Sequence, residues 1–121
     1  MLKKHVHSFR NAISGLMWIV QTQPNFRIHL SLSLLAIAAG YALKINHSEF
    51  LIILSMIGMG LALEAVNTAI EEAIDAIHKD WSEEIKVAKD VSAAAMLIFA
   101  ITALIVASII FIPRLSLFIN F

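Results

Sequence analysis

Apolar positions recur at helical spacing through the first part of the chain. Between residues 4 and 22 they are Val6, Phe9, Ile13, Leu16, Met17 and Val20. Polar residues such as Arg10 and Asn11 fall largely on other faces, and this arrangement is typical of a helix that lies along a surface. Pro24 breaks the pattern, because its ring removes a backbone donor and disfavours the α region for the preceding residue. We therefore predict an amphipathic surface helix over residues 4–22.

Beyond Pro24 the pattern changes to long, nearly continuous apolar runs. We predict three further helices over residues 26–45, 49–78 and 90–112. Each reaches roughly the 17–25 residues that a helix needs to cross a bilayer. Asn46 and Ser48, in the turn before the second of these helices, are both suited to cap it. Pro113 is expected to close the last helix, and HKDWSEEIKVAKD is expected to be a polar connection.

Composition supports a membrane protein. Of the 121 residues 60% are apolar and 15% charged, and the mean hydropathy is +0.83. Soluble domains average roughly 45–50% apolar and 25% charged residues. We therefore expect one all-α membrane domain over residues 1–121. The absence of cysteine excludes disulfides and thiolate zinc sites, and the net charge of zero, without a dense basic run, indicates no nucleic-acid partner.

Basic residues predict the orientation. One side of the predicted bundle collects Lys3, Lys4, Arg10, Arg27, Lys79, Lys86 and Lys89, and the other side has only Lys44 and Arg114. By the positive-inside rule the N-terminus and the connection between the last two helices are cytoplasmic. We expect a multi-pass protein of the bacterial cell membrane whose acidic residues lie at the cytoplasmic face.

A polar stripe ends the apolar run FLIILSMIGMGLAL. On a continuous helix Glu64, Asn67, Thr68, Glu71 and Asp75 share one face, and Glu72 lies to one side. Two carboxylates one or two turns apart, with amide and hydroxyl groups, suit Mg²⁺ that keeps waters and phosphate oxygens. A carboxylate near hydrocarbon is costly, so Glu64 in particular calls for a protein interior or a watery cleft.

The segment AKDVSAAAM brings Lys89 and Asp90 to the same depth, where a lysine can hold a phosphate. Its small residues, Ser92 included, are expected to let membrane helices pack closely. One alternative stays open. The lower acids, Asp75 among them, form structural ion pairs with Lys86 and Lys89, or simply face solvent.

These residues resemble the prokaryotic diacylglycerol kinase and undecaprenol kinase family, small integral-membrane lipid kinases. The resemblance covers nearly the whole chain, through SFRNAISGL, NFRIH, LEAVNTAIEEAID and AKDVSAAAMLI. It implies a homotrimer of three-span protomers, each with an N-terminal surface helix, and composite sites at the cytoplasmic interface. ATP would be the co-substrate and Mg²⁺ the cofactor.

The resemblance also implies roles for individual residues. Glu64 would be the general base toward the lipid hydroxyl, and Glu71 a ligand of Mg²⁺. Lys89 and Asp90 would contact ATP, with the lysine at the γ-phosphate. The residues that would shape the site are Asn67, Thr68 and Asp75.

Two positions depart from the family pattern. Gln23 stands where the family usually has a second metal-binding glutamate, and an amide oxygen can bind Mg²⁺ only without the charge. Lys4 stands where an arginine is common and loses the bidentate fork. With Asn11 of the surface helix and Glu71, both positions are candidate nucleotide-binding residues.

The favoured activity is ATP-dependent phosphorylation of a membrane lipid hydroxyl. Undecaprenol is the favoured acceptor, because NFRIH, NTAIE and IFIPRL are more similar to the undecaprenol-phosphorylating members, and diacylglycerol is the alternative. Gln23 motivates a third hypothesis, a catalytically weakened homologue that acts as a membrane scaffold or regulatory subunit. An ion carrier is disfavoured, because the acids cluster at one face and no polar path crosses residues 52–63.

Overall fold

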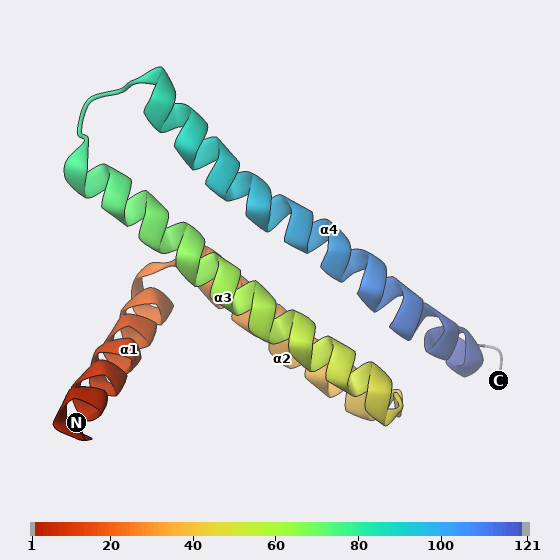
Figure 1. Cartoon of the computed structure of the whole chain (residues 1–121). Coiled ribbons are helices and arrows are strands. Elements are labelled where there is room, and N and C mark those ends of the chain that lie inside the picture. Colours follow the sequence, from red (N-terminus) through yellow and green to blue (C-terminus); the bar gives the residue numbers. More distant parts are fainter. Residues whose placement is uncertain (1, 120–121) are drawn as a thin grey trace.

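The computed structural model describes residues 2–119, with side chains for residues 5–117 and 119. These residues form four helices and no strand, which confirms the predicted all-α fold (Figure 1). The helices are α1 (Leu2–Thr22), α2 (Pro24–Ala42), α3 (His47–Ile77) and α4 (Glu83–Ile119). The side chain of Lys4, a nucleotide-binding candidate, lies outside the described set.

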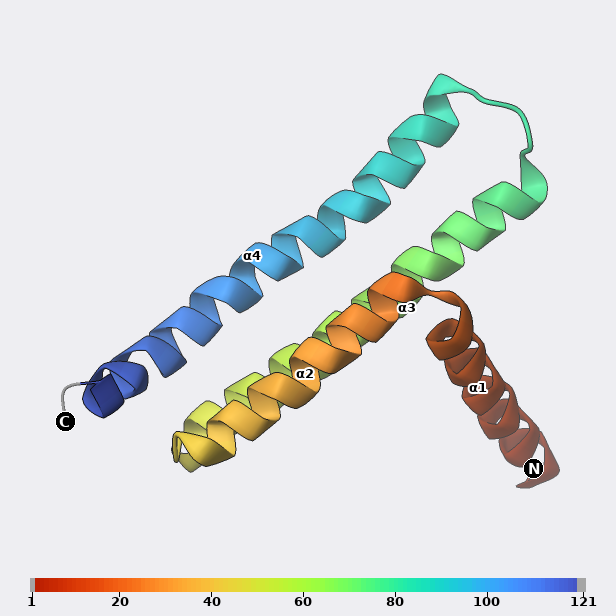
Figure 2. The ribbon, with the colours of Figure 1, turned by 180° about the vertical axis from the view of Figure 1, so that it is seen from behind.

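The helix α3 is the central element. α2 and α4 both run antiparallel to α3 and pack against different sides of it (Figures 1 and 2). α1 projects away from these three helices at an angle and packs mainly against α2. α1 is thus a separate helix, and its place along a membrane surface stays a prediction.

The junction between α1 and α2 lies where proline predicts a break. Gln23 is extended, with φ −102° and ψ 107°, and Pro24 is the first residue of α2. A proline at this position is well tolerated, because the first helical N–H has no partner within the helix. Ile19 and Phe26 are buried on the two sides of the break, so apolar packing holds the change of direction in place.

The turn between α2 and α3 is closed by hydrogen bonds. Of the two predicted caps Asn46 is the one used: its side chain accepts the Glu49 N–H at 2.9 Å, and the Glu49 carboxylate accepts the Asn46 N–H at 2.8 Å. Lys44 has a φ of 52°, in the left-handed region, and its carbonyl accepts a bond from Arg114 at 3.0 Å. Arg114 also pairs with Glu49, and both side chains are about three-quarters buried.

The helix α4 is longer at both ends than the sequence predicts. It begins at Glu83 because the Ser82 hydroxyl oxygen caps it, accepting the Ile85 N–H at 3.3 Å, so the connection is only five residues, His78–Ser82. The expectation that Pro113 ends the helix is wrong. The Ser116 hydroxyl donates to the Pro113 carbonyl at 2.7 Å, and the bonds of Arg114 hold the next turn. The proline therefore sits inside the helix, and the last turns bend aside (Figure 1).

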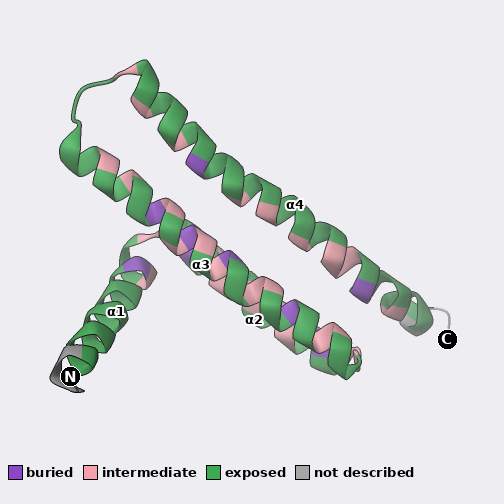
Figure 3. Cartoon of the chain, viewed as in Figure 1, coloured by how far each residue is buried: buried purple, intermediate pink, exposed green. Residues whose placement is uncertain are grey.

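Two of the described helices, α3 and α4 up to Leu117, are long and apolar enough to cross a membrane. Only 17% and 6% of their most apolar windows are buried inside the molecule, and exposed residues cover both helices (Figure 3). Their apolar surface therefore needs lipid or another protein against it. α2 carries Asn25, Arg27 and His29 in its first turns, which lowers its hydropathy, and its place as a third span stays a prediction.

One close contact sets the approach of α4 to α3. A Cβ added at Gly60 would lie 2.4 Å from the Phe99 ring, whereas a Cβ at Gly58 would meet nothing within 4 Å. Gly60 is buried and Gly58 is exposed, although both lie on α3 within one turn. The missing side chain at Gly60 therefore makes room for the aromatic ring of the neighbouring helix.

This contact predicts that Gly60→Ala destabilises the protein by about 1–3 kcal/mol, the usual cost of overpacking. Gly58→Ala is the matched control and should not destabilise the protein, because its Cβ meets nothing and alanine favours a helix over glycine by about 1 kcal/mol. Thermal unfolding in detergent measures both. Adding Phe99→Leu to Gly60→Ala should recover much of the loss. Equal effects of the two alanines would contradict this account of the helix contact.

Candidate functional site

The polar stripe of α3 does not face a single neighbour. Successive residues of the stripe turn toward α2, α4 and α1, because these three helices surround α3 at the end where its apolar run stops. Each neighbour contributes different chemistry.

Glu64 is the most enclosed carboxylate of the stripe. The residue is 4% exposed, and its Oε2 lies 3.8 Å from Nε2 of His29 on α2. This separation is too long for a hydrogen bond, but it places the imidazole directly beside the carboxylate. The structure thus gives Glu64 the protein interior that its position predicts.

Asn67 links α3 to α4. The Ser92 hydroxyl donates to Asn67 Oδ1 at 2.7 Å, and Asn67 Nδ2 reaches Glu71 Oε1 at 3.4 Å. Because Ser92 occupies the oxygen of the amide, the amide nitrogen is directed at Glu71. This role of Ser92 was not predicted, since a serine before three alanines is typical of close helix packing. The one feature of the sequence that could have indicated it is the position of Ser92 three residues after Lys89.

Thr68 and Glu72 face α1. Thr68 is 5% exposed, and both residues line a hollow of about 530 Å³ between α1 and α3. The α1 side of this hollow is formed by Ala12, Gly15, Leu16, Trp18 and Ile19. Asn11 is exposed, next in sequence to the lining residue Ala12. Glu72 is the charged residue that lines this hollow. Because it lies to one side of the stripe, its environment differs from that of Glu64 and Glu71.

The outermost residues of the site form ion pairs. Lys89 Nζ lies 2.5 Å from Asp75 Oδ1, and Lys86 Nζ lies 2.7 Å from Asp90 Oδ2. These contacts agree with the alternative left open by the sequence for Asp75. They also place Lys89 at the end of the stripe, with its charge beyond Glu71 on the side away from the apolar run.

The proposed metal ligands are not gathered into a cage. The described residues contain no group of three or more His, Cys, Asp or Glu that could hold a metal ion. Gln23 is half-buried at the junction of α1 and α2, and its side chain makes no capping hydrogen bond to α2. An oxygen set of one or two residues suits Mg²⁺ that keeps waters and phosphate oxygens, and Glu71 and Gln23 fit that description by chemistry.

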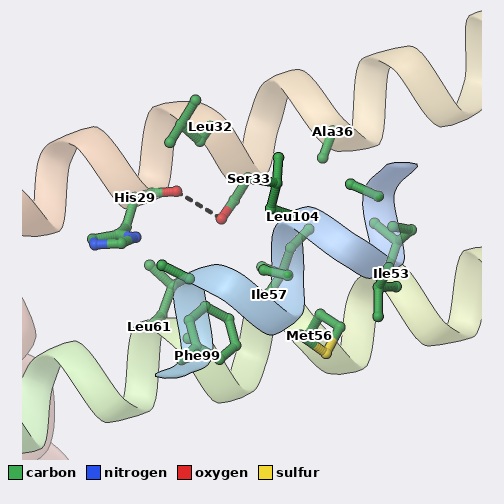
Figure 4. A pocket seen from close by; sticks show the side chains of 15 residues that line it. His29, Leu32, Ser33, Ala36, Ile53, Met56, Ile57, Leu61, Phe99 and Leu104 are labelled. Atoms are coloured by element: carbon green, nitrogen blue, oxygen red, sulfur yellow. Dashed lines mark hydrogen bonds between the residues drawn. The ribbon is translucent and has the colours of Figure 1, made fainter. Parts of the chain in front are cut away.

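An apolar groove lies beside the polar stripe of α3. It has a volume of about 360 Å³ and is formed by α2, α3 and α4, with Leu32, Ile57 and Phe99 among its lining residues (Figure 4). Only His29 and Ser33 of the lining residues carry polar side chains, and the Ser33 hydroxyl donates to the His29 carbonyl at 2.7 Å. The imidazole of His29 therefore forms the polar end of this apolar groove, next to Glu64.

Comparison with known proteins assigns the family. The family model described as prokaryotic diacylglycerol kinase matches residues 10–111. The chain belongs to the prokaryotic diacylglycerol kinase family. This confirms the resemblance noted in the sequence and makes the protein a member of a family of membrane-bound lipid kinases.

Two curated relatives carry different names. The chain is 32% identical over 114 residues to an undecaprenol kinase of Bacillus subtilis, covering 94% of this chain and 93% of the relative. It is 34% identical over 109 residues to a diacylglycerol kinase of Synechocystis sp., covering 89% of this chain but only 62% of that protein. The identities are similar, so the relatives do not settle the acceptor lipid.

The Asp75–Lys89 pair predicts a small effect on stability. The Asp75 side chain is 61% exposed and that of Lys89 36% exposed, and pairs of this kind contribute about 0–1 kcal/mol. Asp75→Asn should therefore shift the unfolding free energy by less than about 1 kcal/mol. Asp90→Asn, which removes the neighbouring pair on α4, is the control. A much larger loss for Asp75→Asn would show that the pair is a structural element of the fold.

Proposed function

We propose that this protein transfers the γ-phosphoryl group of ATP to the hydroxyl of a membrane lipid at the cytoplasmic face of the bacterial cell membrane. Undecaprenol is the favoured acceptor. The observation that carries the proposal is the position of Glu64, a buried carboxylate between the polar end of an apolar groove and the Asn67–Glu71 network. Family membership supports the same reaction class.

The lipid side of the proposed site is the groove of α2, α3 and α4. Its lining is apolar except at His29 and Ser33, so it suits an isoprenoid or acyl chain. A chain in the groove would bring its hydroxyl to the end at which His29 meets Glu64. Glu64 then accepts the hydroxyl proton as the lipid oxygen attacks the γ-phosphorus.

The nucleotide side is formed by the lower part of the stripe. Asn67 holds the Glu71 carboxylate, and Glu71 with Gln23 would hold Mg²⁺, which neutralises phosphate charge when bound. Lys89 would exchange Asp75 for the γ-phosphate, and Asp90 lies one residue further along α4. Lys4 and Asn11 remain candidates on α1, and Thr68 shapes the hollow between α1 and α3.

Undecaprenol is favoured over diacylglycerol for two reasons. The motifs NFRIH, NTAIE and IFIPRL resemble the undecaprenol-phosphorylating members. The undecaprenol kinase also aligns over 93% of its own length, against 62% for the diacylglycerol kinase. A scaffold role for a weakened homologue is the remaining alternative, motivated by Gln23.

A homotrimer is part of the proposal. The apolar faces of α3 and α4 are mostly uncovered within one protomer. A second copy would cover these faces and add residues to the site. Light scattering of the protein–detergent complex measures the number of protomers, and a monomer that retains full activity would overturn this part.

Phosphoryl transfer from labelled ATP tests the function directly. Purified protein with Mg²⁺ is offered undecaprenol and diacylglycerol separately, in matched detergent micelles. Labelled undecaprenyl phosphate at the higher rate would support the favoured acceptor, and labelled phosphatidic acid would support the alternative. Transfer to neither lipid by a folded protein would favour the scaffold role.

Glu64→Gln should lower turnover by about 10²–10⁴-fold, because it removes a proton acceptor and keeps the shape. ATP binding and assembly should be largely unchanged. Glu83→Gln, an exposed glutamate in the first turn of α4, is the matched control and should retain activity. A Glu64→Gln enzyme with normal turnover would remove the general-base role.

Gln23→Glu tests the missing family glutamate. A unit negative charge about 4 Å from a hydrated Mg²⁺ gains about 1 kcal/mol for each of the two positive charges, or about 2 kcal/mol, which is about thirtyfold in affinity. The variant should therefore reach half its maximal rate at about a thirtyfold lower Mg²⁺ concentration, with a smaller change at saturation. Titration of Mg²⁺ against initial rate compares the two proteins, and superimposable curves would remove Gln23 from the site.

A further inference from the structure

A buried general base creates a problem that the proposed reaction leaves unsolved. Each turnover delivers one proton to Glu64, whose side chain is only 5% exposed. The carboxylate must lose that proton before it can accept another one. Direct loss to bulk water requires access that the structure largely denies, because α2 and α3 enclose the group.

His29 is placed to receive the proton. Its Nε2 lies 3.8 Å from Glu64 Oε2, and its side chain is 28% exposed. The imidazole therefore lies beside the buried carboxylate and is itself partly accessible from outside the protein. Contacts of this kind often tighten once substrate is bound. Imidazole is also the side chain that exchanges a proton most readily near neutral pH.

The other residues at this end of the groove do not offer the same route. Ser33 donates its hydroxyl proton to the His29 carbonyl, so it is engaged in the backbone of α2. The α4 residues that line the groove, such as Phe99 and Leu104, are apolar (Figure 4). Within 4 Å of Glu64 the structure places the imidazole of His29, which can accept a proton.

Building on the proposed function, we propose that His29 is a positioning residue that returns Glu64 to its charged form by carrying its proton to water. In the transfer step the lipid oxygen bonds to the γ-phosphorus. The bond from that phosphorus to the bridging oxygen breaks, its electron pair leaves with ADP, and the hydroxyl proton passes to Glu64. Glu64 then gives this proton to Nε2 of neutral His29, and the imidazolium releases one proton to water.

Two simpler roles for His29 lead to different results. A residue that only lines the groove would affect the binding of lipid, hence its KM. A residue that only holds Glu64 in place by a polar contact would be replaced well by a neutral hydrogen-bonding side chain. A proton carrier instead affects kcat, and a free base that enters the vacated space can replace it.

The kinetic experiment uses the full-length protein with His29→Ala, His29→Gln and the control His47→Gln. His47 is an exposed histidine at the start of α3. Both His29 variants should lose about 10–100-fold in kcat, with the KM of lipid and ATP within about twofold. Added imidazole should restore at least a third of kcat in His29→Ala only. Neither His29→Gln nor Glu64→Gln should respond, and His47→Gln should behave as the wild type.

Two kinetic results would overturn the inference. One is a His29→Gln enzyme with kcat within twofold of the wild type. The other is a His29→Ala enzyme whose loss lies in the lipid KM and does not respond to imidazole. Thermal unfolding of each variant shows whether a loss of activity reflects misfolding, and the His29→Gln variant keeps the test informative if His29→Ala is unstable.

A measurement without turnover separates this inference from the proposed function. Histidine ring signals are recorded by NMR in detergent micelles for the wild type and Glu64→Gln. Replacing Glu64 with glutamine should change the chemical shifts of the His29 ring signals and leave those of His47 and His78 as they are in the wild type. Unchanged His29 signals would overturn the proton exchange, whatever the wild type phosphorylates. Failure of the lipid assay with shifted His29 signals would instead reject the proposed function alone.

Discussion

The fold is organised around a carboxylate that has to be buried. Glu64 follows a long apolar run on α3, and a charged group in that position is costly unless protein surrounds it. α2 provides the enclosure and brings His29 with it. The short turn after α2, closed by the Asn46–Glu49 capping box, brings α2 and α3 together as antiparallel neighbours, and His29 then faces the acid.

The remaining polar residues of α3 explain why three helices meet at one end of the molecule. A stripe that shares one face of an isolated helix is still wide enough to contact several neighbours. Asn67 and Asp75 find partners on α4, whereas Thr68 and Glu72 line the hollow beside α1. The same sequence feature therefore supplies a buried carboxylate, an amide network and a charged surface hollow, each in a different environment.

The sequence predicts helices well and their neighbours poorly. Helix existence and the break at Gln23 follow from strong local rules of periodicity and proline geometry. The end of α4 does not follow from such rules. The turn after Pro113 is held by a hydrogen bond from Arg114 to the carbonyl of Lys44, in the turn after α2, and these two residues are 70 apart in the sequence. Ser92 and His29 were missed for the same reason. Ser92 matters because it contacts Asn67, and His29 because it lies beside Glu64. No local sequence pattern identifies a partner on another helix.

The clasp of Arg114 with Lys44 and Glu49 has a consequence for the membrane that this protein fits. Lys89 and Arg114 fasten α4 to α3 at opposite ends, 25 residues apart, or about 37 Å along the helix axis. Hydrocarbon is about 30 Å thick, so both ionic fasteners can remain in the headgroup layers while the apolar stretch between them stays immersed. In a much thicker bilayer one of these pairs would lie in hydrocarbon, so the lipid would have to thin around the protein or the pair would have to separate. The two ion pairs are thus spaced about as far apart as the two headgroup layers of a bilayer of ordinary thickness.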